Sequence, residues 1–389
     1  MNQGNGALRK PELVGWLRPV FSVAIPLYVF LNFSRFYYEN IYLTQALTLL
    51  LVAAGLALFF IILLKYYSNT LYSFASFFLM LSVIGVSLVG QNDTSKALLL
   101  FFANLGFASV LVKYPISPKI SRNIFIGFSL VFLALILSGK KAEDIFLVSR
   151  NYVSIFFLLL VSIHYFACWR YDTKPSLLYS IVGLLFSVLS IGRAGIVVFA
   201  VLFFLTFIFV EEKKAKIILI VTISVSAIFL FLKDHEVELF GSFELIYTGF
   251  ERFERLGTES ARHSINASYL TSAFKNVENF IFGVPLSSLD SVQAVGGNPH
   301  NSFINLHVNF GIFGLMVLLI SIIIAAGKLF ISKSWLVLIV FSACLVRAFF
   351  DVAAFYGPLD IIVMMPLVYF LSNVRFLTDF QMSSTQKIT

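Results

Sequence analysis

The sequence predicts an all-α integral membrane protein with about twelve transmembrane helices and one long polar loop. Hydrophobic residues make up 59% of its 389 residues and charged residues only 12%, roughly half the charged share of a soluble domain. Apolar runs of about 20 residues, the length that crosses a bilayer as a helix, recur along the whole chain. These runs use almost all of the residues. We therefore expect a single polytopic membrane domain over residues 1–389 and no separate soluble domain.

The expected spans follow one another with short polar connections. They cover 16–33, 43–64, 71–90, 97–112, 123–139, 151–169, 176–192, 196–210, 216–232, 304–326, 335–350 and 358–373. Only Gly192-Arg193-Ala194-Gly195 separates the seventh span from the eighth. This tight break predicts tilted or broken helices around a polar point.

The distribution of basic residues predicts which ends of the helices face the cytoplasm. With a cytoplasmic N-terminus, the inside segments hold 16 of the 28 Lys and Arg residues, and several of the others lie in a long loop that counts little. Three basic residues fall on the outer side, against this rule: Lys140, Lys141 and Arg150. This orientation puts the long loop, about residues 234–303, on the outer face of the membrane. Residues 1–15 contain basic residues but no small-residue cleavage site before a short apolar core, so we expect a cytoplasmic tail and not a cleaved signal peptide.

Composition and motifs exclude several other classes of protein. The net charge of +8 is scattered between apolar segments, so topology explains it better than nucleic-acid binding does. Cys168 and Cys344 both lie in apolar spans, which excludes a disulfide framework. No P-loop, dinucleotide fingerprint, CxxC or HExxH is present, so we expect neither a cofactor nor a metal. Any activated donor must then come through the membrane.

The long loop contains one predicted amphipathic helix, at residues 259–274. An apolar stripe runs along it, with Arg262 before the stripe. The stripe consists of Ile265, Tyr269, Leu270 and Phe274. A lone arginine on such a helix is usually a solvated surface charge. The loop as a whole could cover an active site.

The loop ends in a polar cluster, residues 298–302, that leads directly into a hydrophobic helix. His300 is the candidate general base, because an imidazole can accept a proton near neutral pH. Asn301 could orient His300 or a substrate oxygen. In the structural alternative, His300 is an interfacial residue at a helix start, with Asn298 as N-cap and Pro299 at the first helical position. His307 lies seven residues on, too far from His300 for the usual metal pair.

Three charged residues near span ends complete the set of candidates. Arg193 is flanked by glycines and apolar residues, where a charge is costly, and its guanidinium matches phosphate oxygens. Snorkelling to the interface is its structural alternative. Arg347 and Asp351 have the i, i+4 spacing of an intrahelical ion pair, which is the simpler explanation for both. A supporting contact with substrate is the alternative.

Several of these segments together resemble one known family. His300-Asn301, nine further residues and Gly311-Ile312-Phe313-Gly314 are similar to the signature of the O-antigen polymerase and O-antigen ligase superfamily, H-[NSQ], nine residues, G-x-x-[GTY]. Ser260-Ala261-Arg262 followed by Phe282-Gly283 resembles the loop pattern of that family, and the segment 190–195 resembles its S-x-R-x-G type segment. The specific part of the resemblance covers about 55 residues, 260–314, plus Arg193.

The resemblance implies a fold, a reaction and a location. The fold would be GT-C-like, in the bacterial inner membrane, with the active site facing the periplasm. The reaction would be an inverting, metal-independent glycosyl transfer from an oligosaccharide carried on undecaprenyl diphosphate, a step of lipopolysaccharide biosynthesis. His300 would be catalytic, and Arg193 and Arg262 would bind the diphosphate. Outside what the resemblance implies, Asn301, Arg347 and Asp351 are the candidate supporting residues. Partners would be the lipid-linked oligosaccharide, membrane lipid and a chain-length regulator protein.

Three functions remain open at this point. A polymerase would add the growing glycan to the next lipid-linked repeat unit, and the His-Asn-Ser start with the Phe282-Gly283 turn favours it. A ligase would use the same donor and transfer the glycan to lipid A–core. A transporter of polyprenyl-linked glycan would explain the many spans, but not a loop of about 70 residues that ends in a His-Asn pair.

Overall fold

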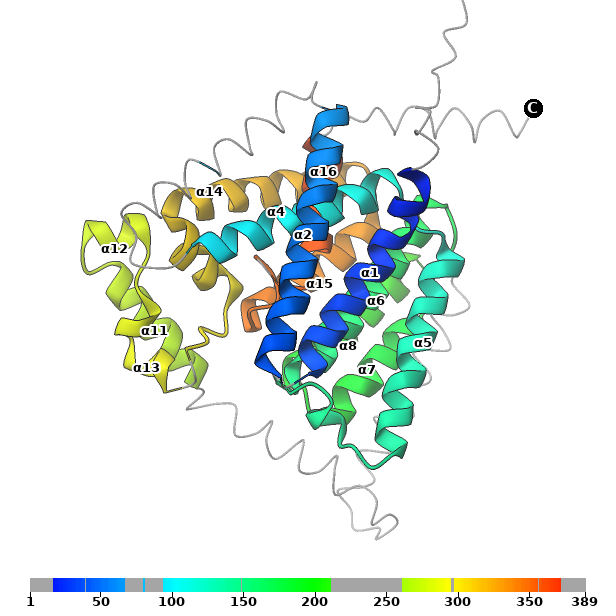
Figure 1. Cartoon of the computed structure of the whole chain (residues 1–389), viewed down its shortest axis with the longest axis horizontal. Helices are drawn as coiled ribbons and strands as arrows, with labels where there is room; N and C mark the ends of the chain where they lie inside the picture. Colours follow the sequence, from blue (N-terminus) through cyan, green and yellow to red (C-terminus); the bar gives the residue numbers. More distant parts are fainter. Residues whose placement is uncertain are drawn as a thin grey trace, which may run out of the picture.

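The computed structural model describes residues 17–38, 40–66, 80, 94–147, 149–210, 261–294, 297–355 and 357–371. All regular structure in these ranges is helical (Figure 1). Seven of the helices are long and apolar enough to cross a membrane. They are α1 (Leu17–Tyr37), α2 (Ile41–Tyr66), α4 (Ser95–Lys113), α5 (Pro118–Leu137), α6 (Asn151–Arg170), α8 (Arg193–Val210) and α14 (Ser302–Ile331).

Three shorter apolar helices accompany them: α7 (Leu178–Leu189), α15 (Trp335–Phe350) and α16 (Asp360–Leu371). Each of these ten helices coincides with an expected span, with ends that differ by a few residues. The expected spans 71–90, apart from residue 80, and 216–232 lie outside the described residues. The class of protein, an all-helical chain of apolar helices, is therefore confirmed over the described part of the chain.

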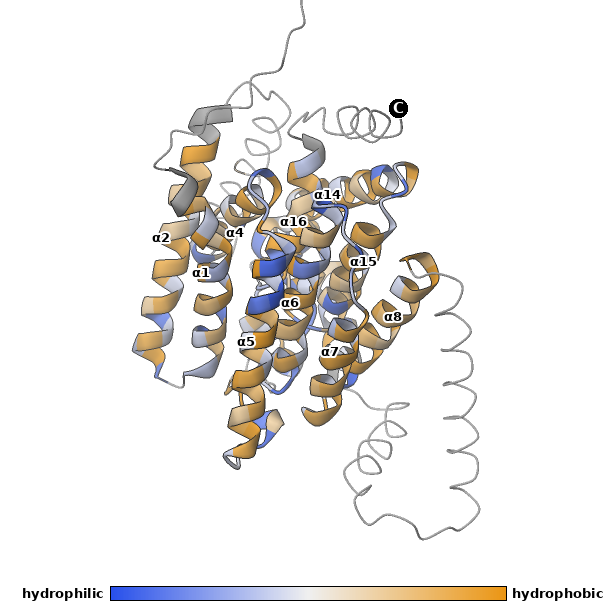
Figure 2. Ribbon diagram, turned by 90° about the vertical axis from the view of Figure 1, so that its right-hand side faces the viewer, coloured by the Kyte–Doolittle hydropathy of each residue, from blue (hydrophilic) through white to orange (hydrophobic). Residues whose placement is uncertain are grey.

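Helix α6 is the centre of the bundle, because 89% of its span is buried against 17% for α5. It packs against α5, α7, α8 and α15. Its buried face is aromatic: the ring of Phe157 stacks on Phe186 of α7, with centroids 4.3 Å apart, and contacts Phe132 of α5 edge-on. The outward surfaces of α5, α7 and α8 are mostly hydrophobic (Figure 2), as lipid-facing helices require.

Two interruptions of regular helix lie inside the bundle. Gly311 has φ 63° and ψ −172°, so it divides α14 into a first part at residues 302–310 and a longer second part. The described part of the connection from α15 to α16, residues 351–355 and 357–359, is almost entirely buried although it is not helical. The Tyr28 hydroxyl donates to the Pro358 carbonyl (3.1 Å), and Asp360 accepts from the Asn104 amide (2.7 Å). Buried irregular backbone of this kind is tolerated in a membrane protein only where protein groups satisfy it.

The described end of the long loop forms a small group of helices that packs against α14. It contains α11 (Ala261–Ala273), α12 (Val277–Phe282), η2 (Leu286–Ser288) and α13 (Asp290–Gln293), which lie together beside α14 (Figure 1). Ile265, Tyr269 and Ala273 of α11 are buried in a small core with Val308 of α14. The predicted apolar stripe was therefore right for Ile265 and Tyr269 and wrong for Leu270 and Phe274. Its register is i, i+4, i+8, which leaves Leu270 and Phe274 52% and 71% exposed.

Candidate active site

The turn that carries His300 is built by its asparagines. The Asn298 side chain accepts from the His300 N–H (2.8 Å), and His300 adopts a positive φ of 49°. The Asn301 side chain then accepts from the N–H groups of Phe303 (2.9 Å) and Ile304 (3.3 Å). Asn301, and not Asn298, is therefore the N-cap of α14. The structural alternative had assigned the cap to Asn298, but the Asn298 side-chain oxygen accepts from the His300 N–H in a local turn instead.

This turn presents the His300 imidazole to a buried carboxylate. His300 Nδ1 lies 3.6 Å from Asp351 Oδ1, and the His300 side chain stays 25% exposed whereas that of Asp351 is almost fully buried. The separation is longer than a hydrogen bond but within range of an ion pair once the imidazole is protonated. One face of His300 can therefore meet a substrate while the other faces a fixed negative charge.

Asp351 connects three elements of the bundle. Its Oδ2 accepts from the Asn151 side-chain amide at the start of α6 (3.0 Å) and lies 3.5 Å from Arg347 Nη2. The same Arg347 nitrogen donates to the Asn151 carbonyl (3.3 Å), and the Arg347 side chain is fully buried. The expected Arg347–Asp351 ion pair is thus present, but it is not merely intrahelical. It holds Asp351 at a fixed place between α6, α15 and the start of α14.

The hydroxyl of Ser302 ties the start of α14 to the Asp351 segment. It donates to the Asp351 carbonyl (2.6 Å) and accepts from the N–H groups of Ala353 (3.0 Å) and Ala354 (3.1 Å). Ser302 is completely buried. One side chain two residues after His300 therefore sets the distance between the imidazole and the carboxylate. The sequence gives no sign of this contact, because it joins residues about 50 positions apart.

Replacing Ser302 with alanine is expected to destabilise the protein by about 1–3 kcal/mol, because the buried Ala354 N–H loses its partner. The Asp351 carbonyl and the Ala353 N–H then keep only their bond to each other (2.9 Å). The matched control is Ser321→Ala on the same helix, where the hydroxyl donates to the Val317 carbonyl one turn earlier (2.7 Å). Thermal unfolding of both purified variants in detergent measures the difference. Equal melting temperatures for the two variants would contradict the role given to Ser302.

Arg193 begins α8, directly after the tight break at residues 190–192. Ile191 has a positive φ of 53°, which turns the chain from α7 into α8. A Cβ on Gly195 would lie 2.2 Å from Cβ of Ser154, so α8 begins against the first turn of α6. That turn also carries Asn151, whose carbonyl accepts from the Ser154 hydroxyl (2.8 Å). The half-buried Arg193 therefore starts its helix beside the part of α6 that holds Asp351.

For Arg262, the other predicted arginine, only the position of the backbone is described. Arg262 lies in the first turn of α11, and its side chain lies outside the described residues. Its helix packs through Ile265 and Tyr269 on the small core that includes Ile304, in the first turn of α14. His300, Asn301, Arg347 and Asp351 are thus brought together, Arg193 starts a neighbouring helix, and the diphosphate-binding roles of Arg193 and Arg262 stay predictions.

His307 anchors the loop helices to α14. Its Nε2 lies 2.8 Å from the Phe280 carbonyl, and its Nδ1 lies 2.6 Å from the Tyr269 hydroxyl. A carbonyl only accepts, so Nε2 carries the hydrogen and Nδ1 accepts from Tyr269. Burial raises the pKa of Tyr269, which keeps that donor protonated. Both ring nitrogens of His307 are therefore engaged, and sequence reasoning missed this structural role.

Gly283 belongs to the same anchor. It has a φ of +89°, and a Cβ there would lie 2.6 Å from the His307 carbonyl oxygen and 3.0 Å from Cα of Val308. The Phe282-Gly283 turn thus needs glycine for two reasons, its backbone conformation and its close approach to α14. This accounts physically for one of the segments that carry the family resemblance.

Gly283→Ala is expected to loosen the loop helices from α14, with a loss of about 2–4 kcal/mol from backbone strain and the clash together. Gly297→Ala is the matched control, because Gly297 has a φ of +78° but open space around it. Limited proteolysis of the purified protein reports loop release. If both variants were cleaved at the same rate, the close approach of Gly283 to α14 would not be what holds the loop helices in place.

No three His, Cys, Asp or Glu side chains in the described ranges gather as metal ligands do. Comparison with known proteins adds no family: no protein-family model matches this chain, and no curated protein matches it significantly. What can be inferred of function therefore comes from the residues and geometry of the site.

Proposed function

We propose that this protein is a glycosyltransferase that polymerises a surface polysaccharide, of the O-antigen polymerase kind. The observation that carries the proposal is the approach of His300 to Asp351 at the start of α14, 3.6 Å apart, within a buried network. A partly exposed imidazole backed by a buried carboxylate is the arrangement of a general base. The resemblance of the segment 300–314 to the O-antigen polymerase and ligase signature adds the reaction class.

His300 would remove the proton from the acceptor hydroxyl. The hydroxyl oxygen attacks C1 of the donor sugar from the side opposite the diphosphate, and the bond from C1 to the diphosphate breaks with inversion. The proton passes to His300 Nε2, because Nδ1 faces Asp351. Asp351 stabilises the imidazolium that forms, and Asn151 and Arg347 keep Asp351 in position. Arg347 is fully buried, so its role is to position Asp351 and not to bind substrate.

The leaving group is undecaprenyl diphosphate, which needs charge neutralisation more than it needs a proton. Arg193 and Arg262 would supply this, since a guanidinium binds two phosphate oxygens at once and keeps its charge in a partly dry site. The start of α8 lies beside the first turn of α6, and α11 packs against the first turns of α14, which supports a shared location. With the diphosphate neutralised in this way, the reaction would proceed without a metal ion.

The orientation in the membrane follows from the basic residues. We place the N-terminus in the cytoplasm and the His300 end of the bundle at the periplasmic face of the bacterial inner membrane. The chain would have twelve spans in a GT-C-like arrangement. The loop 234–303 would cover the site, and the apolar outer surfaces of the helices would receive the polyprenyl chain.

Reconstitution of the purified protein with a lipid-linked repeat unit tests this proposal. The reaction is run in chelator, with and without lipid A–core, and the products are separated by size. A ladder of longer lipid-linked glycans without lipid A–core is expected for a metal-independent polymerase. Product only in the presence of lipid A–core would assign a ligase instead, since both enzymes would use the same donor and the same base. No product in either case would favour transport without chemistry.

A further inference from the structure

A second feature lies at the end of the bundle opposite to His300. It is a cavity of about 460 Å³ between the last residues of α6, α8 and α16, the turn at residues 332–334 after α14, and the start of α15. Helix α6 runs from Asn151, in the His300 network, to Arg170, at this cavity. A helix of that length spans about 30 Å, so the cavity is separate from the candidate active site. Nothing in the proposed glycosyl transfer uses it.

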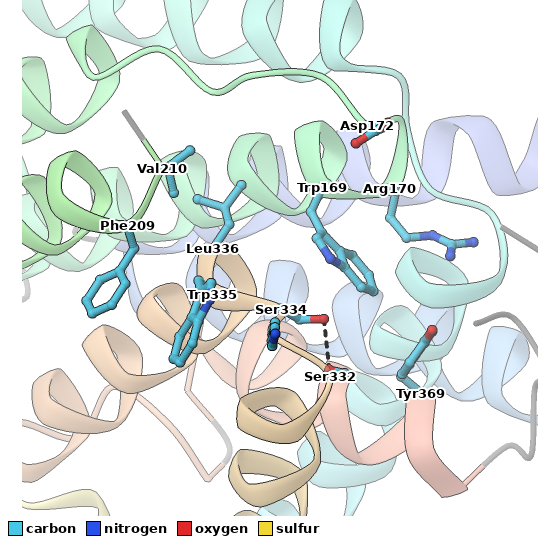
Figure 3. Close-up of a pocket in the computed structure, with 11 residues that line it drawn as sticks. Trp169, Arg170, Asp172, Phe209, Val210, Ser332, Ser334, Trp335, Leu336 and Tyr369 are labelled. Atoms are coloured by element: carbon cyan, nitrogen blue, oxygen red, sulfur yellow. Dashed lines mark hydrogen bonds between the residues drawn. The ribbon is translucent and has the colours of Figure 1, made fainter. Parts of the chain in front are cut away.

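The lining of the cavity is both basic and aromatic. Figure 3 shows Trp169, Arg170 and Tyr369 on one side and Phe209 and Trp335 on the other, with Ser332 and Ser334 between them. Phe209 and Trp335 stack with ring centroids 5.1 Å apart, and Trp169 and Tyr369 meet edge-on at 5.6 Å. Tryptophan and tyrosine are enriched in membrane proteins at the membrane–water interface, because their rings are apolar at one end and polar at the other.

Positive charge predominates among the described residues of the cavity. Arg170 and Lys333 line it, and Asp172 is the one carboxylate among the described lining residues. Like charges held together at the edge of a low-dielectric bundle repel each other, and an anion would relieve that repulsion.

The surroundings indicate which kind of anion. The cavity lies where membrane-length helices end, and the hydrophobic side chains of Phe209 at its rim and of Ile331 beside it are largely exposed. A ligand that enters here meets cations and hydroxyls at one end and apolar surface at the other. A volume of this size falls within the range of small-molecule sites, about 300–1,000 Å³, and would hold a lipid headgroup.

We propose that this cavity binds the phosphate of an anionic phospholipid, with Arg170 and Lys333 as the ligands of the phosphate. Basic pockets between transmembrane helices are a known means of holding anionic headgroups. Trp169 and Trp335 flank the headgroup, and the acyl chains lie along the exposed apolar surface at the ends of α8 and α14. The bound lipid would fix the ends of α6, α8, α14 and α16 relative to one another. The inference does not rest on the function proposed for the His300 end.

Native mass spectrometry of the purified full-length protein in detergent tests the site, with phosphatidylglycerol titrated against phosphatidylcholine. We expect one phosphatidylglycerol to bind in preference. Lys333→Asn removes one charge without strain, because Lys333 has a positive φ of 54°, which asparagine tolerates. This variant and Arg170→Gln should each weaken phosphatidylglycerol binding about fivefold. Lys328→Gln is the matched control, an exposed lysine near the end of α14 that does not line the cavity, and should bind as the wild type does.

Three results would overturn the proposal. The first is unchanged phosphatidylglycerol affinity in Lys333→Asn, which is at an exposed position and should fold normally. The second is an equal loss of phosphatidylglycerol affinity in Lys328→Gln, which would mean that the lipid is attracted to basic residues in general. The third is displacement of the lipid by inorganic phosphate at equal concentration, which would make this a site for soluble phosphate.

Discussion

Replacement of His300 with alanine is expected to abolish glycan transfer while leaving membrane insertion and folding intact. Loss of a general base lowers the rate about 10²–10⁴-fold. The His300 side chain makes few structural contacts: it is partly exposed, and its Nδ1 is 3.6 Å from Asp351. The turn itself is held by the Asn298 and Asn301 side chains, which the substitution leaves in place. Transfer is measured with the purified variant and a lipid-linked repeat unit.

A second substitution at the same position separates catalysis from packing. His300→Gln keeps a polar side chain of similar size but cannot accept a proton, so it should be as inactive as His300→Ala. Size-exclusion profiles and melting temperatures of both variants should match those of the wild type. Wild-type activity in either variant would remove His300 from the mechanism. Inactivity accompanied by misfolding would instead assign it a structural role.

Breaking the Arg347–Asp351 pair is expected to have the largest effect on stability. Arg347→Met or Asp351→Leu alone leaves one buried charge without its counter-charge, which costs about 3–5 kcal/mol. The double variant Arg347→Met/Asp351→Leu should recover most of that loss, because two apolar side chains of similar volume replace the pair. It should remain inactive, since Asp351 no longer faces His300. Thermal unfolding in detergent and the transfer assay measure the two effects.

The partly exposed pair Arg150–Glu143 provides the control for this cycle. Its atoms are 3.7 Å apart and its side chains are 38% and 31% exposed. The single substitution Glu143→Ala should cost less than about 1 kcal/mol, as is usual for surface ion pairs. If Arg347→Met cost no more than Glu143→Ala, the buried pair would not be the anchor of the Asp351 segment. Activity in the double variant would exclude a role for Asp351 in supporting His300.

The helices of this protein could be predicted because each apolar run is long enough to be recognised as a helix of a membrane protein. The ten described apolar helices fall on expected spans. The tight break between α7 and α8 is present, but it lies at residues 190–192, with Ile191 at positive φ, and not at 192–195 as expected. The register of the loop helix could not be predicted reliably. Leu270 and Phe274 are as apolar as Ile265, but only tertiary packing decides which face of α11 meets α14.

In the candidate site, too, local patterns could be predicted from the sequence and long-range contacts could not. His300 and the Arg347–Asp351 spacing are visible in the sequence because each is a local pattern. The contacts of Asp351 with Asn151 and Ser302 are not, since they join α6, α14 and the buried segment after α15 across 200 and 49 positions. The interruption at Gly311 and the close approach of Gly283 to α14 likewise depend on how elements meet in space.

The most direct test of the central claim is the stoichiometry of leaving-group release. Purified protein is given a lipid-linked oligosaccharide in proteoliposomes, and free undecaprenyl diphosphate is measured together with new glycosidic bonds. A glycosyltransferase of the proposed kind releases one undecaprenyl diphosphate for each bond formed, with inverted configuration at C1, and His300→Ala releases none. Movement of the intact lipid-linked oligosaccharide across the membrane, with no diphosphate released, would contradict the proposed catalytic function.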